Sequence, residues 1–182
     1  MNAPDAVARF GSGRAVPRIE DRGLLQGRGR FTDNVEVAGA APIAFLRSPY
    51  AHARIAGIDV AAARAMPGVI GVFTGADLAA AGVKGLPTTP DFRRADGRST
   101  VSPLRRALAH EVARYVGEAI VAVVAESREQ ARDALDAIVL DLEELASVTD
   151  ARAAVQAGAA VVTAEAPDNI AAEMRHGDAA AT

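Results

Sequence analysis

The sequence contains no cysteine and no tryptophan, and aromatic residues make up only 4% of it. Without cysteine, the chain cannot form a disulfide, ligate an iron–sulfur cluster through thiolates or use a cysteine nucleophile. The shortage of aromatic side chains removes the usual stacking platform for single-stranded nucleic acid. Alanine supplies much of the 50% hydrophobic content. We therefore expect a thin, closely packed core whose elements lie near one another.

Strong charge and long apolar runs are also missing. The formal net charge is -3, which gives no general attraction to nucleic acid or to an anionic membrane. No apolar stretch reaches the roughly 20 residues of a membrane-spanning helix. The N-terminus lacks the basic-then-apolar pattern of a secretory leader, so the sequence favours the cytoplasm. A chain of 182 residues suits one domain, alone or with tails.

The firmest local prediction is a strand–helix–strand unit between Tyr115 and Leu145. Residues 116–125 form an almost unbroken, valine-rich apolar run, which is typical of a strand buried on both faces. Ser127 and Gln130 have the spacing of a capping box at the start of a helix. Apolar residues at helical spacing follow, and then an alternating stretch that predicts a second strand.

A similar strand–helix–strand pattern is predicted between residues 43 and 73, where Pro49 indicates a bulge or a sheet edge.

Residues 82–110 form a different kind of segment, because they hold prolines, glycines and arginines without periodicity. A loop of this length is usually functional, disordered or ordered by a partner. Its five arginines could bind an acidic surface or a phosphate group, although a solvated, mobile loop is the simpler alternative. They are Arg93, Arg94, Arg98, Arg105 and Arg106.

The two ends of the chain show no clear period. Residues 1–17 are rich in Gly, Ala and Arg, which predicts a disordered tail. Residues 18–150 are expected to form the domain. Residues 151–182 are expected to form a C-terminal extension or a linker.

No complete catalytic or metal-binding motif is present. His110 and Glu111 begin like a His-Glu-x-x-His zinc motif, but Arg114 stands where the second ligand is required. Glu118, at the mouth of the buried strand, is either a desolvated functional acid or a carboxylate that accepts backbone amides, and the second is favoured. His52 is expected to be a hydrogen-bonded structural histidine. Residue chemistry alone therefore indicates an α/β-type domain with no visible active site.

Three stretches carry a family resemblance through their order and spacing. They are Arg18-Ile19-Glu20-Asp21 with Gly27-Arg28-Gly29-Arg30-Phe31-Thr32-Asp33-Asn34; Arg47-Ser48-Pro49-Tyr50-Ala51-His52 with Phe73-Thr74-Gly75-Ala76-Asp77-Leu78; and Arg114-Tyr115-Val116-Gly117-Glu118. Together they resemble the large subunits of molybdenum hydroxylases, the family of xanthine dehydrogenase, aldehyde oxidase and aerobic carbon monoxide dehydrogenase. The resemblance runs from about Arg18 to Asp178.

The resemblance implies the family's first domain, the α/β hammerhead, an α+β fold with a mixed sheet. In complete enzymes of this family the large subunit carries a molybdenum–pterin cofactor. Electrons then pass through iron–sulfur clusters to a flavin (FAD), often on separate subunits. The family's pterin-binding glycine motifs and its catalytic glutamate lie downstream of this domain. The resemblance therefore assigns no catalytic, cofactor-binding or metal-binding residue to this chain.

We accordingly expect a structural and interface domain that packs against the remaining large-subunit domains or against iron–sulfur and flavin subunits. As a natural subunit, a truncation or a fragment, it is not expected to be catalytic by itself. The candidate interface residues are Arg47, Tyr50, His52, Arg93, Arg94, Arg98, Arg105 and Arg106. The alternative is a stand-alone, non-catalytic domain that binds an anionic ligand or protein through its arginine-rich loop.

Overall fold

The computed structural model describes residues 17–32, 35, 37–86, 93–94, 96–173 and 177, and the chain divides into two units, residues 1–40 and 41–182. The described part of the first unit contains the short helix α1 (Asp21–Leu25), none of whose residues is buried. The Asp21 carboxylate accepts bonds from the Arg18 amide at 2.8 Å and from Arg18 Nε at 2.9 Å. The tail predicted over residues 1–17 lies outside the described residues except for Pro17, as do Asp33 and Asn34 of the first motif.

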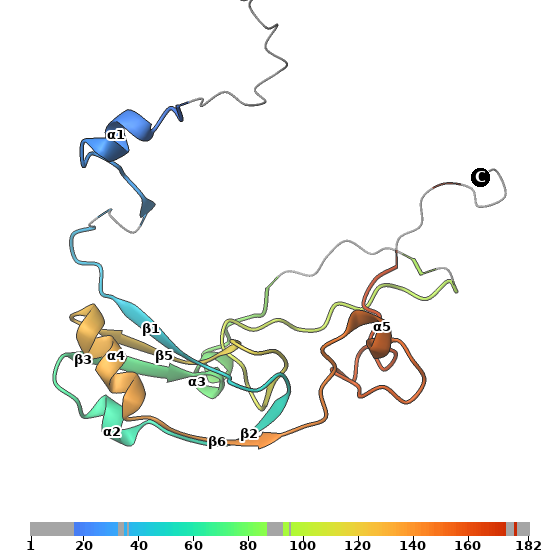
Figure 1. The fold of residues 1–182 in the computed structure, drawn as a ribbon. Helices are drawn as coiled ribbons and strands as arrows, with labels where there is room; N and C mark the ends of the chain where they lie inside the picture. The colour runs from blue at the N-terminus through green and yellow to red at the C-terminus, as the bar shows by residue number, and fades with distance from the viewer. Residues whose placement is uncertain are drawn as a thin grey trace, which may run out of the picture. The chain divides into compact units, whose positions relative to one another are not determined.

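The second unit contains two three-stranded antiparallel sheets, with the strand orders β1–β5–β3 and β4–β2–β6 (Figure 1). The strands are β1 (Ile43–Arg47), β2 (Ala53–Asp59), β3 (Val69–Thr74), β4 (Val112–Ala113), β5 (Ala119–Ala125) and β6 (Val139–Glu144). The helices described in this unit are α2 (Ala61–Arg64), α3 (Gly75–Ala80), α4 (Arg128–Asp136) and α5 (Ala151–Ala154).

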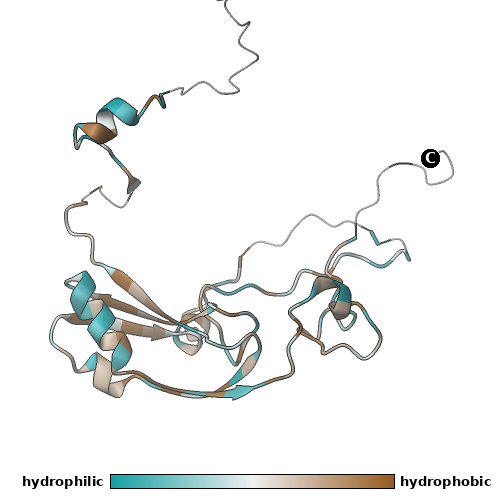
Figure 2. Cartoon of the chain, in the orientation of Figure 1, coloured by the Kyte–Doolittle hydropathy of each residue, from teal (hydrophilic) through white to brown (hydrophobic). Residues whose placement is uncertain are grey.

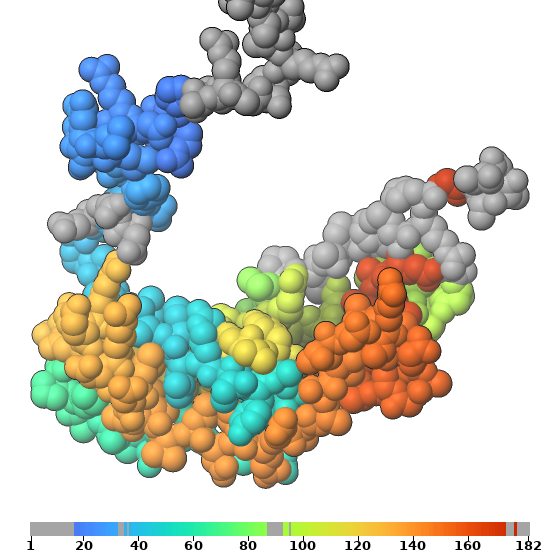
Figure 3. Space-filling model, viewed as in Figure 1, coloured from blue at the N-terminus to red at the C-terminus, as the bar shows by residue number. Residues whose placement is uncertain are grey.

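β5 is the central strand of the first sheet and the centre of the core. Ile120, Val121 and Val123 are fully buried on it. α4 packs against this sheet through Ala131 and Ala134, which are also fully buried. Because alanine projects little beyond the backbone, the helix can approach the strands closely. Figure 3 shows α4, in yellow-orange, at the molecular surface.

Side-chain polarity follows this arrangement. Figure 2 shows brown, hydrophobic strands in the first sheet and teal, hydrophilic residues along the exposed side of α4. Such amphipathicity is typical of a helix that covers a core with one face. None of the helices in the described ranges is long and apolar enough to span a membrane.

The α+β class is confirmed, and the predicted strand–helix–strand unit forms as β5, α4 and β6. The expected mixed sheet is replaced by two antiparallel sheets. β1 pairs with one side of β5 and β3 with the other. Because β5 has no free side, β6 pairs with β2 instead. β1 is an edge strand whose register shifts between Leu46 and Arg47, close to the bulge predicted at Pro49.

The predicted capping box at α4 forms only in part. Ser127 Oγ accepts a bond from the Gln130 amide at 3.2 Å. Gln130 Oε1, however, is buried without a hydrogen-bond partner among the described residues. The side chain of Gln130 lies against Gly68, where a Cβ atom would come within 2.2 Å of Gln130 Nε2. Gln130 therefore contributes packing at the β3 side of the helix instead of a reciprocal cap.

Candidate functional site

Two of the sequence motifs meet at one end of the first sheet. The Ser48 amide donates to the Glu118 carbonyl and the Gly117 amide donates to the Ser48 carbonyl, both at 2.8 Å. Arg47 Nη1 donates to the Gly117 carbonyl at 2.9 Å. Gly117 has a φ of 87°, in the left-handed region that favours glycine. We call Arg47, Ser48, Tyr50, Gly117 and Glu118 the motif junction.

The Glu118 side chain stabilises the turn that leads into β5. Its Oε2 accepts a bond from the Arg114 amide at 2.5 Å, which agrees with the favoured role of a carboxylate that accepts backbone amides. Glu118 also lines a pocket of about 150 Å³. Residues with side chains of both charges share this pocket, among them Arg106, His110, Glu111, Arg114 and Glu165. The mixture of charges gives the pocket no clear preference for an anion or a cation.

His52 and Tyr50, both predicted as interface residues, have different surroundings. His52 Nδ1 donates to the Ala146 carbonyl at 2.8 Å, and the His52 carbonyl accepts from the Leu145 amide at 2.9 Å. His52 therefore joins the start of β2 to the end of β6, as expected of a structural histidine. Tyr50 bonds to the buried Ser48 hydroxyl through its backbone. Its ring is partly exposed at the surface.

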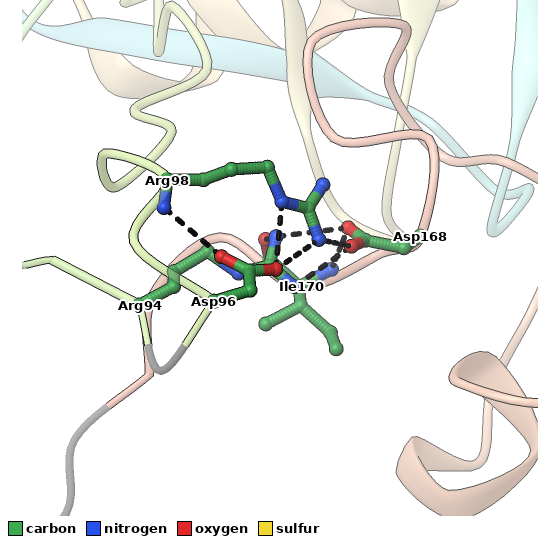
Figure 4. Close-up of polar contacts among 5 residues, drawn as sticks. All are labelled: Arg94, Asp96, Arg98, Asp168 and Ile170. Carbon is green, nitrogen blue, oxygen red and sulfur yellow. Dashed lines mark hydrogen bonds and ion pairs between the residues drawn. The ribbon is translucent and has the colours of Figure 1, made fainter.

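The arginine-rich loop is anchored through Arg94, whose side chain is only 5% exposed (Figure 4). Its guanidinium forms a forked pair with Asp168, with Nη2–Oδ2 at 2.7 Å and Nη1–Oδ1 at 3.3 Å. Nη1 also donates to the Ile170 carbonyl at 3.2 Å. Arg98 Nη2 reaches Asp168 Oδ2 at 3.1 Å and Asp96 Oδ2 at 2.7 Å. We call Arg94, Asp96, Arg98, Asp168 and Ile170 the arginine anchor.

Charge pairing dominates the electrostatics of the arginine anchor. Hydrogen bonds from Arg94 hold the pKa of the Asp168 carboxyl well below its usual range. The side chain and the backbone amide of Arg98 likewise lower the pKa of Asp96. Both carboxylates are therefore charged at neutral pH and balance the two arginines. Arg94 and Arg98 are consequently less available to an external anion.

The other three loop arginines lie apart from this ion-pair network. Arg93 Nη1 donates to the Gly97 carbonyl at 3.1 Å, and the side chain is exposed. Arg105 is exposed, and its carbonyl accepts from the Leu86 amide at 2.7 Å. Arg106 lines the pocket that Glu118 shares. The structure thus brings Arg106 near the motif junction and places Arg94 and Arg98 together in the anchor.

Sequence reasoning missed Asp168 and Asn169. Asn169 has a φ of 56°, and its Nδ2 donates to the carbonyls of Ala154 and Ala160, both at 2.9 Å. Its Oδ1 accepts from the Val162 amide at 3.0 Å. The Pro-Asp-Asn turn sequence was the available signal for Asn169, because asparagine tolerates the left-handed conformation. Asp168 gave no such signal, since Arg94 lies 74 positions away.

The described residues offer no cluster of side chains that would ligate a metal ion. Within these ranges, no three His, Asp or Glu side chains are grouped so that they could hold a metal ion. The guanidinium groups of the arginine anchor, which could otherwise attract a phosphate, are already neutralised by Asp96 and Asp168.

Comparison with known proteins identifies the family. Residues 26–146 match the model described as "Aldehyde oxidase and xanthine dehydrogenase, a/b hammerhead domain". The chain belongs to this hammerhead family. The expected fold type is thereby confirmed, and the match includes both strand–helix–strand patterns and the motif junction.

Relatives of this hammerhead domain are large subunits of oxidoreductases. It is 45% identical over 167 residues to "Nicotine 6-hydroxylase large subunit" from Paenarthrobacter nicotinovorans, covering 90% of the chain and 19% of that protein. It is 31% identical over 160 residues to "Carbon monoxide dehydrogenase large chain" from Afipia carboxidovorans, covering 88% of the chain and 18% of that protein. The chain thus spans about a fifth of the length of these relatives.

A solved structure also matches this chain over a small part of its own length. Quinoline 2-oxidoreductase from Pseudomonas putida 86 superimposes with a TM-score of 0.68 at 41% sequence identity. The match covers 79% of the hammerhead chain and 18% of that protein chain. The similarity is therefore one of most of this chain to a small part of a longer protein chain.

Proposed function

We propose that this hammerhead domain is the N-terminal structural and interface domain of a molybdenum-dependent hydroxylase large subunit. The observation that carries the proposal is the asymmetry of the match, which covers 90% of the chain but only 19% of the nicotine 6-hydroxylase large subunit. A domain in this position would stabilise and position its neighbours, while substrate conversion would take place elsewhere in the subunit.

The motif junction supports an interface role. It fixes the start of β5 to the end of β1 by backbone hydrogen bonds, so nearby side chains project from a rigid base. Tyr115 and Val116, just before the junction glycine, are exposed, as is the Tyr50 ring. Exposed aromatic and aliphatic groups on a rigid base are typical of surfaces that another domain covers. Arg106 lines the pocket beside this region and completes the candidate interface.

In the complete enzyme, the molybdenum–pterin cofactor would supply the oxidation chemistry. We place it in the remaining large-subunit domains, with the iron–sulfur clusters and FAD on partner domains or subunits. The described side chains of this hammerhead domain would contribute packing and hydrogen bonds. No described residue is assigned to bind substrate, move a proton or hold a metal.

The alternative of a stand-alone domain that binds anions through its arginine-rich loop has less support. Two of the five arginines, Arg94 and Arg98, are paired with Asp96 and Asp168. An anion would have to compete with these carboxylates, which remain charged at neutral pH because their pKa values are lowered.

The decisive experiment is gentle purification of the native protein, followed by intact mass and molybdenum analysis. We expect the sequence to occur in, or to co-purify with, a larger assembly that contains molybdenum. A bare species of 18.7 kDa without molybdenum or partners would contradict the proposal and would direct attention to binding instead of oxidation.

A further inference from the structure

The first sheet has an apolar face turned away from α4. Strand pairing assigns this face, because directly paired residues project to the same side of a sheet. Phe45 and Phe73 both pair with Ala122, and Ile43 pairs with Val124. We call Ile43, Phe45, Phe73 and Val124 the open face.

The opposite face of the same sheet is the core face. Ala44 and Leu46 of β1 pair with Val123 and Val121 of β5. All four belong to the hydrophobic core, which also includes the buried alanines of α4. The sheet is therefore apolar on both sides, but α4 covers only one of them. A sheet with a solvated second face would instead show polar residues there.

The exposed fractions show that the open face is incompletely covered. Ile43 is 53% exposed, Phe45 37% and Phe73 44%. At the centre of the sheet, Ala122 is buried and Val124 partly buried. Clustered apolar side chains on one rigid sheet face are typical of a site for another protein surface, whereas single exposed ones are ordinary.

Both phenylalanine rings are held in place by neighbours. A Cβ atom on Gly71 would lie 2.9 Å from the Phe73 ring, so the ring occupies the space that glycine leaves free. Arg47 Cζ lies 5.4 Å from the centre of the Phe45 ring, a cation–π distance. Such positioned aromatic rings lose little conformational entropy when a partner covers them.

We propose that the open face packs against the remaining part of the large subunit, which presents an apolar surface with a carboxylate at its edge for Arg47. This inference rests on the proposed function. The large-subunit relatives are about five times longer than this chain, so most of such a subunit is available to cover the face. Arg47 forms no ion pair with any residue in the described ranges, which leaves its charge for an acidic group of the partner.

The test grafts the full 182-residue chain into the P. nicotinovorans nicotine 6-hydroxylase large subunit, in place of the matching region. Phe45→Glu and Phe73→Glu place a charge on the open face. Val139→Glu is the matched control, because Val139 is 67% exposed and lies on β6 of the other sheet. We expect the open-face variants to lower recovery of monodisperse subunit about tenfold, and the control to stay within about twofold of the unsubstituted graft.

A second measurement is needed because the glutamate introduced by Phe45→Glu or Phe73→Glu could prevent the graft from folding. Phe45 is replaced by the photoreactive aromatic p-benzoylphenylalanine in the same graft, and cross-linked peptides are mapped by mass spectrometry after irradiation. We expect cross-links from position 45 to peptides of the large-subunit remainder. Cross-links only within the grafted chain, or only between two copies of it, would overturn the inference.

The two proposals fail in different ways. If the native protein is a bare species of 18.7 kDa without molybdenum or partners, the proposed function fails and this inference fails with it. If the graft is recovered but Phe45→Glu and Phe73→Glu behave like Val139→Glu, only the assignment of the open face is wrong.

Discussion

Asp168 is a single residue that links the arginine-rich loop to the C-terminal segment. It accepts bonds from Arg94 and Arg98, and the amide of Val101 donates nearby to the Ala171 carbonyl at 2.9 Å. The chain's own C-terminal segment therefore holds Arg94, Arg98 and Val101 of the loop without a partner. The loop arginines remain predicted interface residues, but at least Arg94 also has a structural role.

We predict that Asp168→Asn lowers the midpoint of thermal unfolding by a few degrees at pH 6, because it leaves the buried Arg94 without a carboxylate. Since the pKa of Asp168 is lowered in the folded protein, its stabilisation is present above the unfolded value of about 3.9 and is lost as the pH falls toward the folded value. The difference between wild type and variant should therefore be full at pH 6 and shrink below about pH 4.

Asp133→Asn is the control for this pH series, because Asp133 is exposed on α4, outside the arginine anchor. Its midpoint should follow that of the wild type from pH 6 to pH 3. An Asp168→Asn difference that grows as the pH falls would show that the Arg94 pair does not carry the effect.

Gly75 is required by a close backbone approach. A Cβ atom there would lie 2.1 Å from the Ala109 carbonyl oxygen, and backbone cannot move aside as a flexible side chain can. We expect Gly75→Ala to destabilise the domain by about 1–3 kcal/mol in denaturant unfolding. Gly57→Ala is the control, since its Cβ would be in ordinary contact at 3.7 Å from Asp141 Cβ. Equal effects of both substitutions would contradict this steric explanation.

At the scale of elements, the sequence predicted where strands and helices lie along the chain, but not which strands pair with each other. The valine-rich run 116–125 became β5 (Ala119–Ala125), because continuous apolar character reflects burial on both faces. The neighbours of β5 could not be predicted in the same way. β1 and β3 reach it from 40 or more positions away, and no local period encodes which strand occupies which edge. The two antiparallel sheets therefore emerged only from the structure.

The same limit applies to the candidate site. The sequence singled out the residues of the motif junction, yet it gave no sign that Ser48 would pair with Gly117 and Glu118. The five loop arginines could be read as one group because they are close in the chain. Their separation into anchored and exposed side chains depends on Asp168, a distant partner that follows no local pattern.

At the start of α4, substitutions of Ser127 and of Gln130 should differ in their effect on stability. Ser127 accepts a bond from the Gln130 amide, so Ser127→Ala should cost about 1 kcal/mol of unfolding free energy. Gln130→Ala should cost less, because its buried Oε1 has no partner in the described part of the chain and its removal relieves an unsatisfied polar group. Chemical denaturation of both variants checks the order, and a larger loss for Gln130→Ala would contradict it.

At the scale of the whole molecule, each of the two units exposes apolar side chains. In the first unit Ile19 is 98% exposed and Leu25 is 87% exposed, and the second unit carries the open face. Single exposed apolar residues are ordinary, but a group of them on one sheet face, as on the open face, is typical of a surface that binds another protein surface. The open face agrees with the proposal that another part of a large subunit packs on this domain.

We therefore predict that the isolated 182-residue chain binds a hydrophobic fluorescent dye or associates with itself. The double variant Ile19→Ser and Leu25→Ser, and separately Phe45→Glu, should each lower the dye signal measurably, since the first removes two highly exposed apolar side chains and the second places a charge on the open face. Val155→Ser is the matched control, because Val155 is only 51% exposed and lies outside the open face, so the dye signal should be nearly unchanged. A monodisperse monomer that binds no dye would contradict the incomplete surface on which the interface role depends.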